Sequence, residues 1–273
     1  MDLTTPVSWT VNCSIVFPDV PLLDRPRAAA DAGFDAVEFW WPFPTAVPAD
    51  RDVDAFVTAV RDAGVTLSGL NFFAGDMPAG ERGVLSDPKR STEFVDNVDV
   101  TVGIGAQLGA TGFTALYGNR IEGIDPAEQD ALAVENLAIA GRAAAAENAV
   151  VLVEPVSGTP TYPLLTAADA VAVLDRVRDE AGVDALRLLL DVYHLAVNGD
   201  DVETAIDTHA DRIGHVQIAD APGRGEPGTG DLPIGPWLDR IHATGYRGRV
   251  GLEYKPTAAD PFAWLRTSER TPA

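Results

Sequence analysis

Short apolar runs alternate with longer segments of helical pattern along the whole chain, and this alternation restricts the possible folds more than any other feature. The apolar runs have the length of buried strands and lie at residues 8–14, 36–40, 66–73, 113–118, 150–155, 186–194, 214–219 and 249–256. Helical patterns follow them at residues 22–33, 52–63, 88–109, 126–147, 166–181, 201–211, 235–244 and 259–269. Strands that alternate with helices pair in parallel. Eight such units in about 250 residues predict an α/β chain folded as a (β/α)8 barrel.

Glycines mark the junctions between these units. In DAGFDAVEF, DAGVTLSGL and ATGYRGRVGLEY a glycine ends a helix and the next strand begins a few residues later. The alternative α/β architecture is an open, doubly wound sheet. The first strand is not followed by a Gly-x-Gly-x-x-Gly motif, which weakens a dinucleotide-binding fold. Because the eight units leave no remainder for a second domain, we expect residues 1–273 to form a single barrel domain.

The charge balance is strongly acidic. The chain has 41 aspartates and glutamates against 20 lysines and arginines, a formal net charge of −21, and its lysines are Lys89 and Lys255. Such a surface repels nucleic-acid phosphates and anionic membranes. The simple interpretation is a solvated acidic surface. A sharper one is adaptation to high salt, since an aspartate-rich, lysine-poor composition resembles that of proteins from extreme halophiles.

Other features of the sequence predict a cytoplasmic protein. The chain has no run of 18 apolar residues, and its N-terminus lacks a basic region followed by an apolar one, so neither a membrane span nor a signal peptide is expected. Cys13 is the single cysteine, which excludes an internal disulfide and a cysteine-rich metal site. A homo-oligomer remains possible.

Polar side chains occupy the ends of several predicted strands, where the active site of a (β/α)8 barrel lies. The fifth strand ends in Glu154, the sixth carries Asp191, Tyr193 and His194, the seventh carries His215 and Gln217, and the eighth ends in Glu253 and Lys255. Polar groups in apolar runs are costly unless they are paired or bind something. Any one of them alone could be structural: Glu154 in a salt bridge, or His194 as a satisfied core histidine. Glu38, at the end of the second strand, is expected to be a structural hydrogen-bond partner and not a ligand.

Three carboxylates at one level of a barrel repel one another, and a divalent cation between them removes that repulsion. Oxygen ligands from Glu154, Asp191 and Glu253, with Gln217 or a ring nitrogen, suit Mg²⁺ or Mn²⁺. Two glutamates on opposite sides of a bound ketone could remove and return a proton, while the metal polarises the carbonyl.

Five stretches carry a resemblance to known proteins. They read SIVFPDVPLLDRPRAAADAGFDAVEFWWPF, GDMPAGERGVLSDPKRSTEF, LLLDVYH, GHVQIADAPGRGEPGTGD and GLEYKP. Together, from about residue 8 to about residue 256, they resemble the hydroxypyruvate isomerase family of the xylose isomerase-like TIM barrel superfamily. The resemblance implies a divalent metal and an aldose–ketose type isomerisation through a cis-enediol.

The resemblance also implies roles for individual residues. Glu154 and Glu253 are the acid/base pair and also metal ligands, and Asp191 and Gln217 complete the metal site. His194 and Arg224 hold substrate oxygens, and Arg224 can fork onto a substrate carboxylate. Glu226 and Lys255 are further candidates at the substrate, on the glycine-rich loop and after the last strand. We expect Glu226 to position that loop.

The substrate stays open between related acids and sugars. Conversion of hydroxypyruvate to tartronate semialdehyde is the first expectation, because 3-keto-sugar epimerases of the superfamily have a histidine where this chain has Gln217. The loop PVSGTPTYPLLT after Glu154 is nearer to members that act on 2-oxo-tetronates. An abasic-site endonuclease needs a histidine-rich zinc cluster and a basic groove, which four histidines and a net charge of −21 oppose. A non-catalytic sugar-acid binding protein would not need both glutamates.

The acidic excess predicts a response to salt. Unfolding free energy and activity should rise with KCl into the molar range, where the Debye length falls to about 3 Å and surface repulsion is screened. Chemical denaturation at low and high KCl measures this. Stability that is flat or falling with salt argues against halophilic adaptation.

Overall fold

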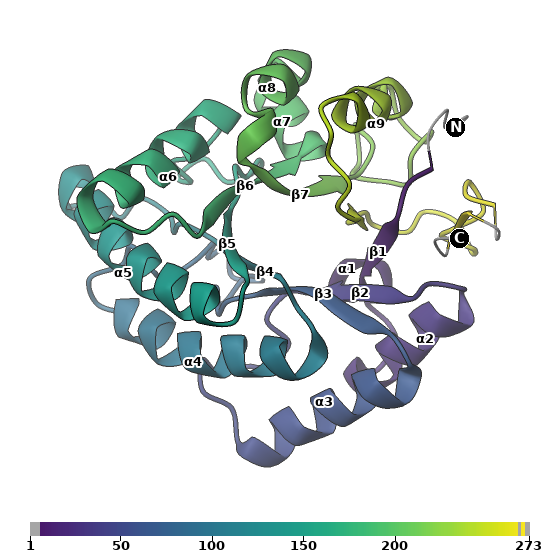
Figure 1. Cartoon of the computed structure of the whole chain (residues 1–273), viewed down its shortest axis with the longest axis horizontal. Coiled ribbons are helices and arrows are strands. Elements are labelled where there is room, and N and C mark those ends of the chain that lie inside the picture. Colours follow the sequence, from purple (N-terminus) through teal and green to yellow (C-terminus); the bar gives the residue numbers. More distant parts are fainter. Residues whose placement is uncertain (1–5, 267–268, 271–273) are drawn as a thin grey trace.

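Eight parallel strands close into a barrel, as the sequence predicts. The computed structural model describes residues 6–266 and 269–270. Each strand pairs with the next, and the last pairs with the first (Figure 1). The strands are β1 (Trp9–Asn12), β2 (Ala36–Phe39), β3 (Thr66–Asn71), β4 (Gly112–Ala115), β5 (Val150–Val153), β6 (Leu186–Asp191), β7 (Ile213–Ile218) and β8 (Val250–Leu252). Mostly buried on both faces, they form the near-continuous apolar runs seen in the sequence.

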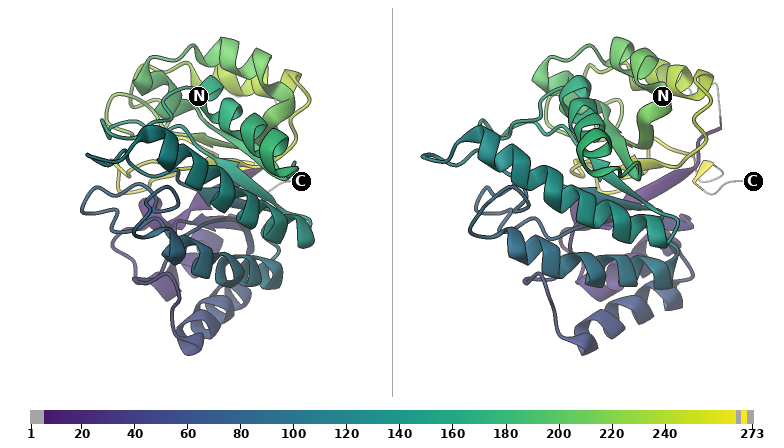
Figure 2. Two further views of the ribbon diagram at one scale, coloured as in Figure 1. Left: turned by 90° about the vertical axis from the view of Figure 1, so that its left-hand side faces the viewer. Right: turned by 60° about the vertical axis from the view of Figure 1, so that its left-hand side comes forward.

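Helices cover the outside of the barrel between the strands (Figure 1). They are α2 (Arg25–Asp31) after the short 3₁₀ turn η1 (Leu22–Asp24), α3 (Asp50–Ala63), α4 (Ser91–Leu108), α5 (Pro126–Ala146), α6 (Ala167–Ala181), α8 (Val202–Thr208) followed by η2 (Ala210–Arg212), and α9 (Ile234–Ala243). The helices α4, α5 and α6, coloured from blue through teal to green, lie side by side along one flank (Figure 2). Gly64, Gly109 and Gly182 end α3, α4 and α6 in left-handed backbone conformations that favour glycine. In the described part of the chain, no helix is long and apolar enough to cross a membrane.

The prediction of a final helix over residues 259–269 is wrong for the residues that the structure describes there. Residues 261–264 form turns, and the segment lies beside β1 and α2 (Figure 1). Trp264 meets Trp9 edge-on at 5.6 Å between ring centres, and Phe262 packs on Phe34 at 4.7 Å. The Arg270 guanidinium donates to the carbonyls of Phe262 and Leu265. The segment is therefore not helical, and aromatic packing and hydrogen bonds from Arg270 hold it against the barrel.

All eight strands end before the residue predicted from the sequence, and at two of them the chain turns into a short helix at the carboxyl end. The helix α1 (Cys13–Val16) follows β1, and α7 (Val192–Asn198) follows β6. Asp191 caps α7, since its Oδ1 accepts from the backbone N–H groups of Tyr193 and His194. His194 thus lies on a helix directly after the strand that carries Asp191.

Candidate active site

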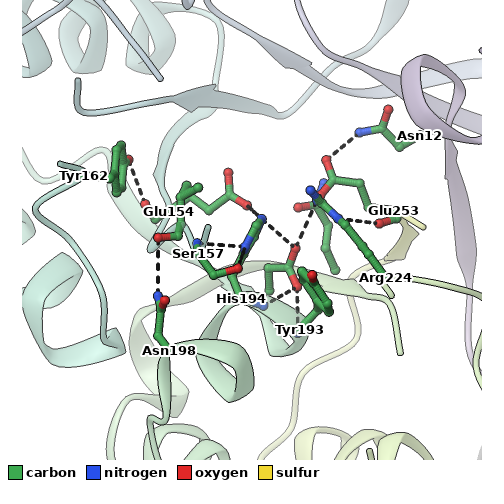
Figure 3. Close-up of polar contacts among 12 residues, drawn as sticks. Asn12, Glu154, Ser157, Tyr162, Tyr193, His194, Asn198, Arg224 and Glu253 are labelled. Atoms are coloured by element: carbon green, nitrogen blue, oxygen red, sulfur yellow. Dashed lines mark hydrogen bonds and ion pairs between the residues drawn. The ribbon is translucent and has the colours of Figure 1, made fainter. Parts of the chain in front are cut away.

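Three buried carboxylates and a histidine converge at the carboxyl ends of β5, β6 and β8. One ligand atom each from Glu154, Asp191, His194 and Glu253 lies within 4.8 Å of the others. Figure 3 shows the side chains of Glu154, His194 and Glu253 around a common space. The structure therefore brings together the three carboxylates that the sequence places at strand ends.

Burial and mutual repulsion disturb the ionisation of this cluster. The pKa of Glu154 is raised well above its ordinary value by burial and by the charges of Glu253 and Asp191. Burial also raises the pKa of Glu253 to about 7, although Arg224 opposes the shift. A cluster of this kind is stabilised by added positive charge.

Arg224 supplies part of that charge. Its guanidinium forms an ion pair with Glu253, donates from Nε to the Glu253 carbonyl at 3.3 Å, and lies 3.8 Å from Asp191 Oδ2 (Figure 3). The guanidinium also lies over the ring of Tyr193, 5.3 Å from its centre. The backbone of Arg224 is left-handed, with φ of 58°. The glycine-rich loop after β7 thus carries Arg224 over the barrel mouth.

Asn12 and Trp40 also bind Glu253. Asn12 Nδ2 donates to Glu253 Oε1 at 2.9 Å, and the Trp40 indole donates to the same oxygen at 2.7 Å. Neither Asn12 nor Trp40 is among the site residues predicted from the sequence. The signal for Asn12 was present, because it is a polar residue inside the apolar run WTVNCSI.

Two buried oxygens on adjacent strands lack a hydrogen-bond partner within the described chain: Asp191 Oδ2, on a residue of the cluster, and Gln217 Oε1. Asp191 and Gln217 are paired neighbours on β6 and β7. Buried acceptors without donors are costly, so both atoms fit a bound cation. With Glu154 and Glu253 they make an oxygen-rich donor set that suits a hard divalent ion.

Glu38 fixes the direction of the Gln217 amide. Gln217 Nε2 donates to Glu38 Oε1 at 2.6 Å, and His215 Nε2 lies 2.7 Å from Glu38 Oε2. A carboxylate that faces an amide at this distance accepts from its NH₂ group, so Gln217 Oε1 points away from Glu38. Glu38 is a structural hydrogen-bond partner, as expected. Gln217 itself borders a small cavity inside the barrel and not the outer pocket.

His194 is arranged as a hydrogen-bond donor. Its Nδ1 accepts from the backbone N–H of Ser157 at 2.9 Å. Burial lowers the pKa of His194 to about 4, so the ring is neutral at pH 7. The proton of the neutral ring is then on Nε2, which lies 3.8 Å from Glu154 Oε1 and 3.7 Å from Asp191 Oδ2. A protonated Nε2 donates to an oxygen and does not bind a metal.

A pocket of about 1130 Å³ opens above the cluster. Glu154, His194, Arg224, Glu253 and Lys255 all line it. Trp41, Phe43 and Met77 contribute apolar walls.

Glu226 is not among the residues that line this pocket. It is buried, and its carboxylate accepts from Thr257 N at 2.8 Å, Thr257 Oγ1 at 2.6 Å and Ala258 N at 3.2 Å. These bonds join the glycine-rich loop to the segment after β8. The position of Glu226 agrees with a role in holding the loop.

Comparison with known proteins identifies relatives over nearly the whole length. The family model described as xylose isomerase-like TIM barrel matches residues 26–268. A putative hydroxypyruvate isomerase of Streptomyces coelicolor is 51% identical over 96% of each chain. The hydroxypyruvate isomerase of Escherichia coli is 32% identical over 94% of this chain and 97% of its own. The 2-oxo-tetronate isomerase of Cupriavidus necator is 34% identical, with the same coverage.

One solved structure is similar to this chain in both fold and sequence. The crystal structure described as AP endonuclease, family 2, from Brucella melitensis superimposes with a TM-score of 0.85 at 32% identity. The match covers 96% of this chain and 98% of that one.

The raised pKa of Glu253 predicts how the metal-free protein responds to pH. A carboxyl whose pKa is about 7 in the folded state and near 4.5 in the unfolded state binds more protons when folded. Its contribution to the free energy of unfolding therefore falls as pH rises from about 4.5 to 7. Urea unfolding in a chelator, between pH 5 and 8, should show a smaller decline for Glu253→Gln than for wild type. Identical pH dependence of the two proteins would contradict the raised pKa.

Proposed function

Because the chain belongs to the xylose isomerase-like TIM barrel family, we propose that it is a metal-dependent isomerase of small hydroxy-oxo acids that converts hydroxypyruvate to tartronate semialdehyde. Its sequence identity to hydroxypyruvate and 2-oxo-tetronate isomerases indicates that it is an isomerase. One observation carries the rest of the proposal. Two buried glutamates, both with raised pKa values, face one pocket from β5 and β8.

Glu154, Asp191, Gln217 and Glu253 are the proposed ligands of a divalent cation, Mg²⁺ or Mn²⁺. Their donors are oxygens, and two of these, Asp191 Oδ2 and Gln217 Oε1, have no other partner in the described chain. When bound, such an ion polarises the substrate carbonyl and offsets negative charge that develops on its oxygen.

The two glutamates then move one proton between neighbouring carbons. One carboxylate removes a proton from the hydroxyl-bearing carbon, whose electron pair forms the double bond of a cis-enediol as the carbonyl oxygen gains a proton. The proton returns to the former carbonyl carbon, and loss of the proton from the other hydroxyl gives the aldehyde. Asn12 and Trp40 keep one oxygen of Glu253 in place. His194 Nε2 donates to a substrate oxygen, and Arg224 binds another.

Two other reactions use the same pair of glutamates. A 2-oxo-tetronate isomerase carries out the same steps on a four-carbon acid, and the Cupriavidus relative favours this second candidate. A 3-keto-sugar epimerase returns the proton to the same carbon from the other face. Gln217, in place of the histidine expected in such epimerases, favours the isomerases. Hydroxypyruvate, 2-oxo-tetronate, tagatose and fructose, tested with Mg²⁺ and with Mn²⁺, separate the three.

Replacement of either glutamate tests the proton transfer. Glutamine keeps the size and a metal-binding oxygen but takes no proton at neutral pH. Glu154→Gln and Glu253→Gln should each slow exchange of the carbon-bound hydrogen of hydroxypyruvate with D₂O by about 10²–10⁴-fold, with the fold intact by circular dichroism. The exposed Glu128→Gln on α5 is the charge control and should exchange at the wild-type rate. Wild-type exchange in both active-site variants excludes this mechanism.

Glu38 tests the role assigned to Gln217. An alanine at position 38 leaves the Gln217 amide free to rotate and present its NH₂ group to the metal. Glu38→Ala should weaken Mn²⁺ binding, measured by calorimetry, by about 10–100-fold. Gln217→Ala should weaken binding at least as much, and the double variant should add little. Unchanged affinity in Gln217→Ala means that Gln217 is not a ligand.

A further inference from the structure

The pocket gathers positive charge although the protein is strongly acidic. Five of its lining residues are basic: Arg25, Arg82, Arg90, Arg224 and Lys255. Glutamates and aspartates outnumber basic residues 41 to 20 over the chain. An arginine that lines the active-site pocket with guanidinium N–H groups bonded to no described residue indicates an anionic ligand.

Three of these arginines are already engaged. Arg224 pairs with Glu253, and Arg90 pairs with Glu81 and Glu93. The guanidinium of Arg25 donates to the backbone carbonyls of residues 13, 18 and 20.

Arg82 differs from them, because it has no carboxylate partner within the described residues and only one of its guanidinium nitrogens bonds to any of them. It is half-buried, and its Nη1 donates to the carbonyls of Met77 at 2.9 Å and Glu81 at 2.7 Å. No described residue bonds to its Nε or Nη2. One nitrogen of the guanidinium thus fixes its orientation, while its remaining N–H groups stay available.

The loop between β3 and α4 holds Arg82 firmly at the pocket. Gly118 N–H donates to the Arg82 carbonyl at 2.9 Å, and Gly83 N–H donates to the Ala74 carbonyl at 2.9 Å. Gly83 has φ of 102°, and a Cβ there would collide with the Leu116 carbonyl. The backbone on both sides of the arginine is therefore pinned to neighbouring loops, which favours a preformed binding site.

The charge of Arg82 reaches the catalytic cluster. Burial and then the positive charge of Arg224 lower the pKa of Arg82. Arg82 also contributes to the lowered pKa of His194, after burial and Arg224. An anion between Arg82 and Arg224 relieves this repulsion. Arg224 is less suited to hold that anion alone, since its Nη2 is bound to Glu253.

We propose that Arg82 binds the carboxylate of the substrate and makes the enzyme selective for hydroxy-oxo acids over neutral ketoses. This inference rests on the proposed function and refines it. The forked guanidinium edge of Arg82 matches a carboxylate, and the carboxylate at this position directs the adjacent keto and hydroxyl carbons towards Glu154 and Glu253. Arg224 then pairs with Glu253 and donates a hydrogen bond to another substrate oxygen.

The experiment compares an acid with its neutral counterpart. The metal-loaded wild type, Arg82→Gln and Arg82→Lys are assayed for D₂O exchange on hydroxypyruvate and on dihydroxyacetone, which has CH₂OH in place of the carboxylate. Arg82→Gln should raise KM for hydroxypyruvate by about ten-fold or more, with exchange on dihydroxyacetone unchanged. Arg82→Lys should recover part of the loss. Arg51→Gln removes a positive charge from an exposed position of α3 and should behave as wild type.

A binding measurement separates this inference from the proposed function. Calorimetry with glycerate, an acid without the keto group, should show at least about ten-fold weaker binding to Arg82→Gln than to wild type. Equal loss on hydroxypyruvate and dihydroxyacetone, or no loss on either, overturns the role of Arg82. If the wild type exchanges neither compound, the proposed reaction fails, and glycerate binding alone decides the role of Arg82: equal affinity in the two proteins rejects it.

Discussion

Repulsion among three buried carboxylates is the constraint on which the rest of the site depends. Glu154, Asp191 and Glu253 end three strands that the closed barrel brings together, so their proximity follows from the fold. The surrounding groups compensate the negative charge. Backbone N–H groups of α7 donate to Asp191. Glu253 accepts from Asn12 and Trp40 and also pairs with the Arg224 guanidinium. Asp191 Oδ2 and Gln217 Oε1 have no donor among the described residues, and this observation supports the proposed divalent cation.

Residues behind the site orient the side chains of Gln217 and His194 through hydrogen bonds. Glu38 on β2 holds the amide of Gln217 on β7 across the barrel interior. Gly251 allows this contact, since a Cβ there would lie 2.8 Å from Gln217 Cγ. Ser157 in turn sets the tautomer of His194. The chemistry therefore depends on residues from most strands, and the barrel closure supplies them at one end.

The strands, most of the helices and the three carboxylates could be predicted, because each depends on local pattern. Apolar runs mark the strands, glycines mark the helix ends, and a carboxylate at the end of such a run is visible in the sequence. Among the described residues the last predicted helix was wrong: the chain there forms turns in which Phe262 and Trp264 pack on Phe34 and Trp9. Periodicity alone does not show such distant partners.

The residues that the sequence did not reveal lie on loops or act across the barrel. Arg82 is one arginine in the loop between β3 and α4. Only the structure shows that it lines the pocket and lacks an acidic partner in the described chain. Glu226 looked like a residue at the substrate, but the structure directs its carboxylate to Thr257 and Ala258. Loop conformations of this kind depend on tertiary contacts far apart in the sequence.

The central claim is that the carboxylate cluster holds a divalent cation, and a crystal structure with Mn²⁺ tests it most directly. Anomalous scattering at the manganese edge should give one strong peak between the side-chain oxygens of Glu154, Asp191, Gln217 and Glu253, at distances of about 2.0–2.4 Å. A fully occupied ion bound elsewhere, with the four oxygens still unliganded, contradicts the account.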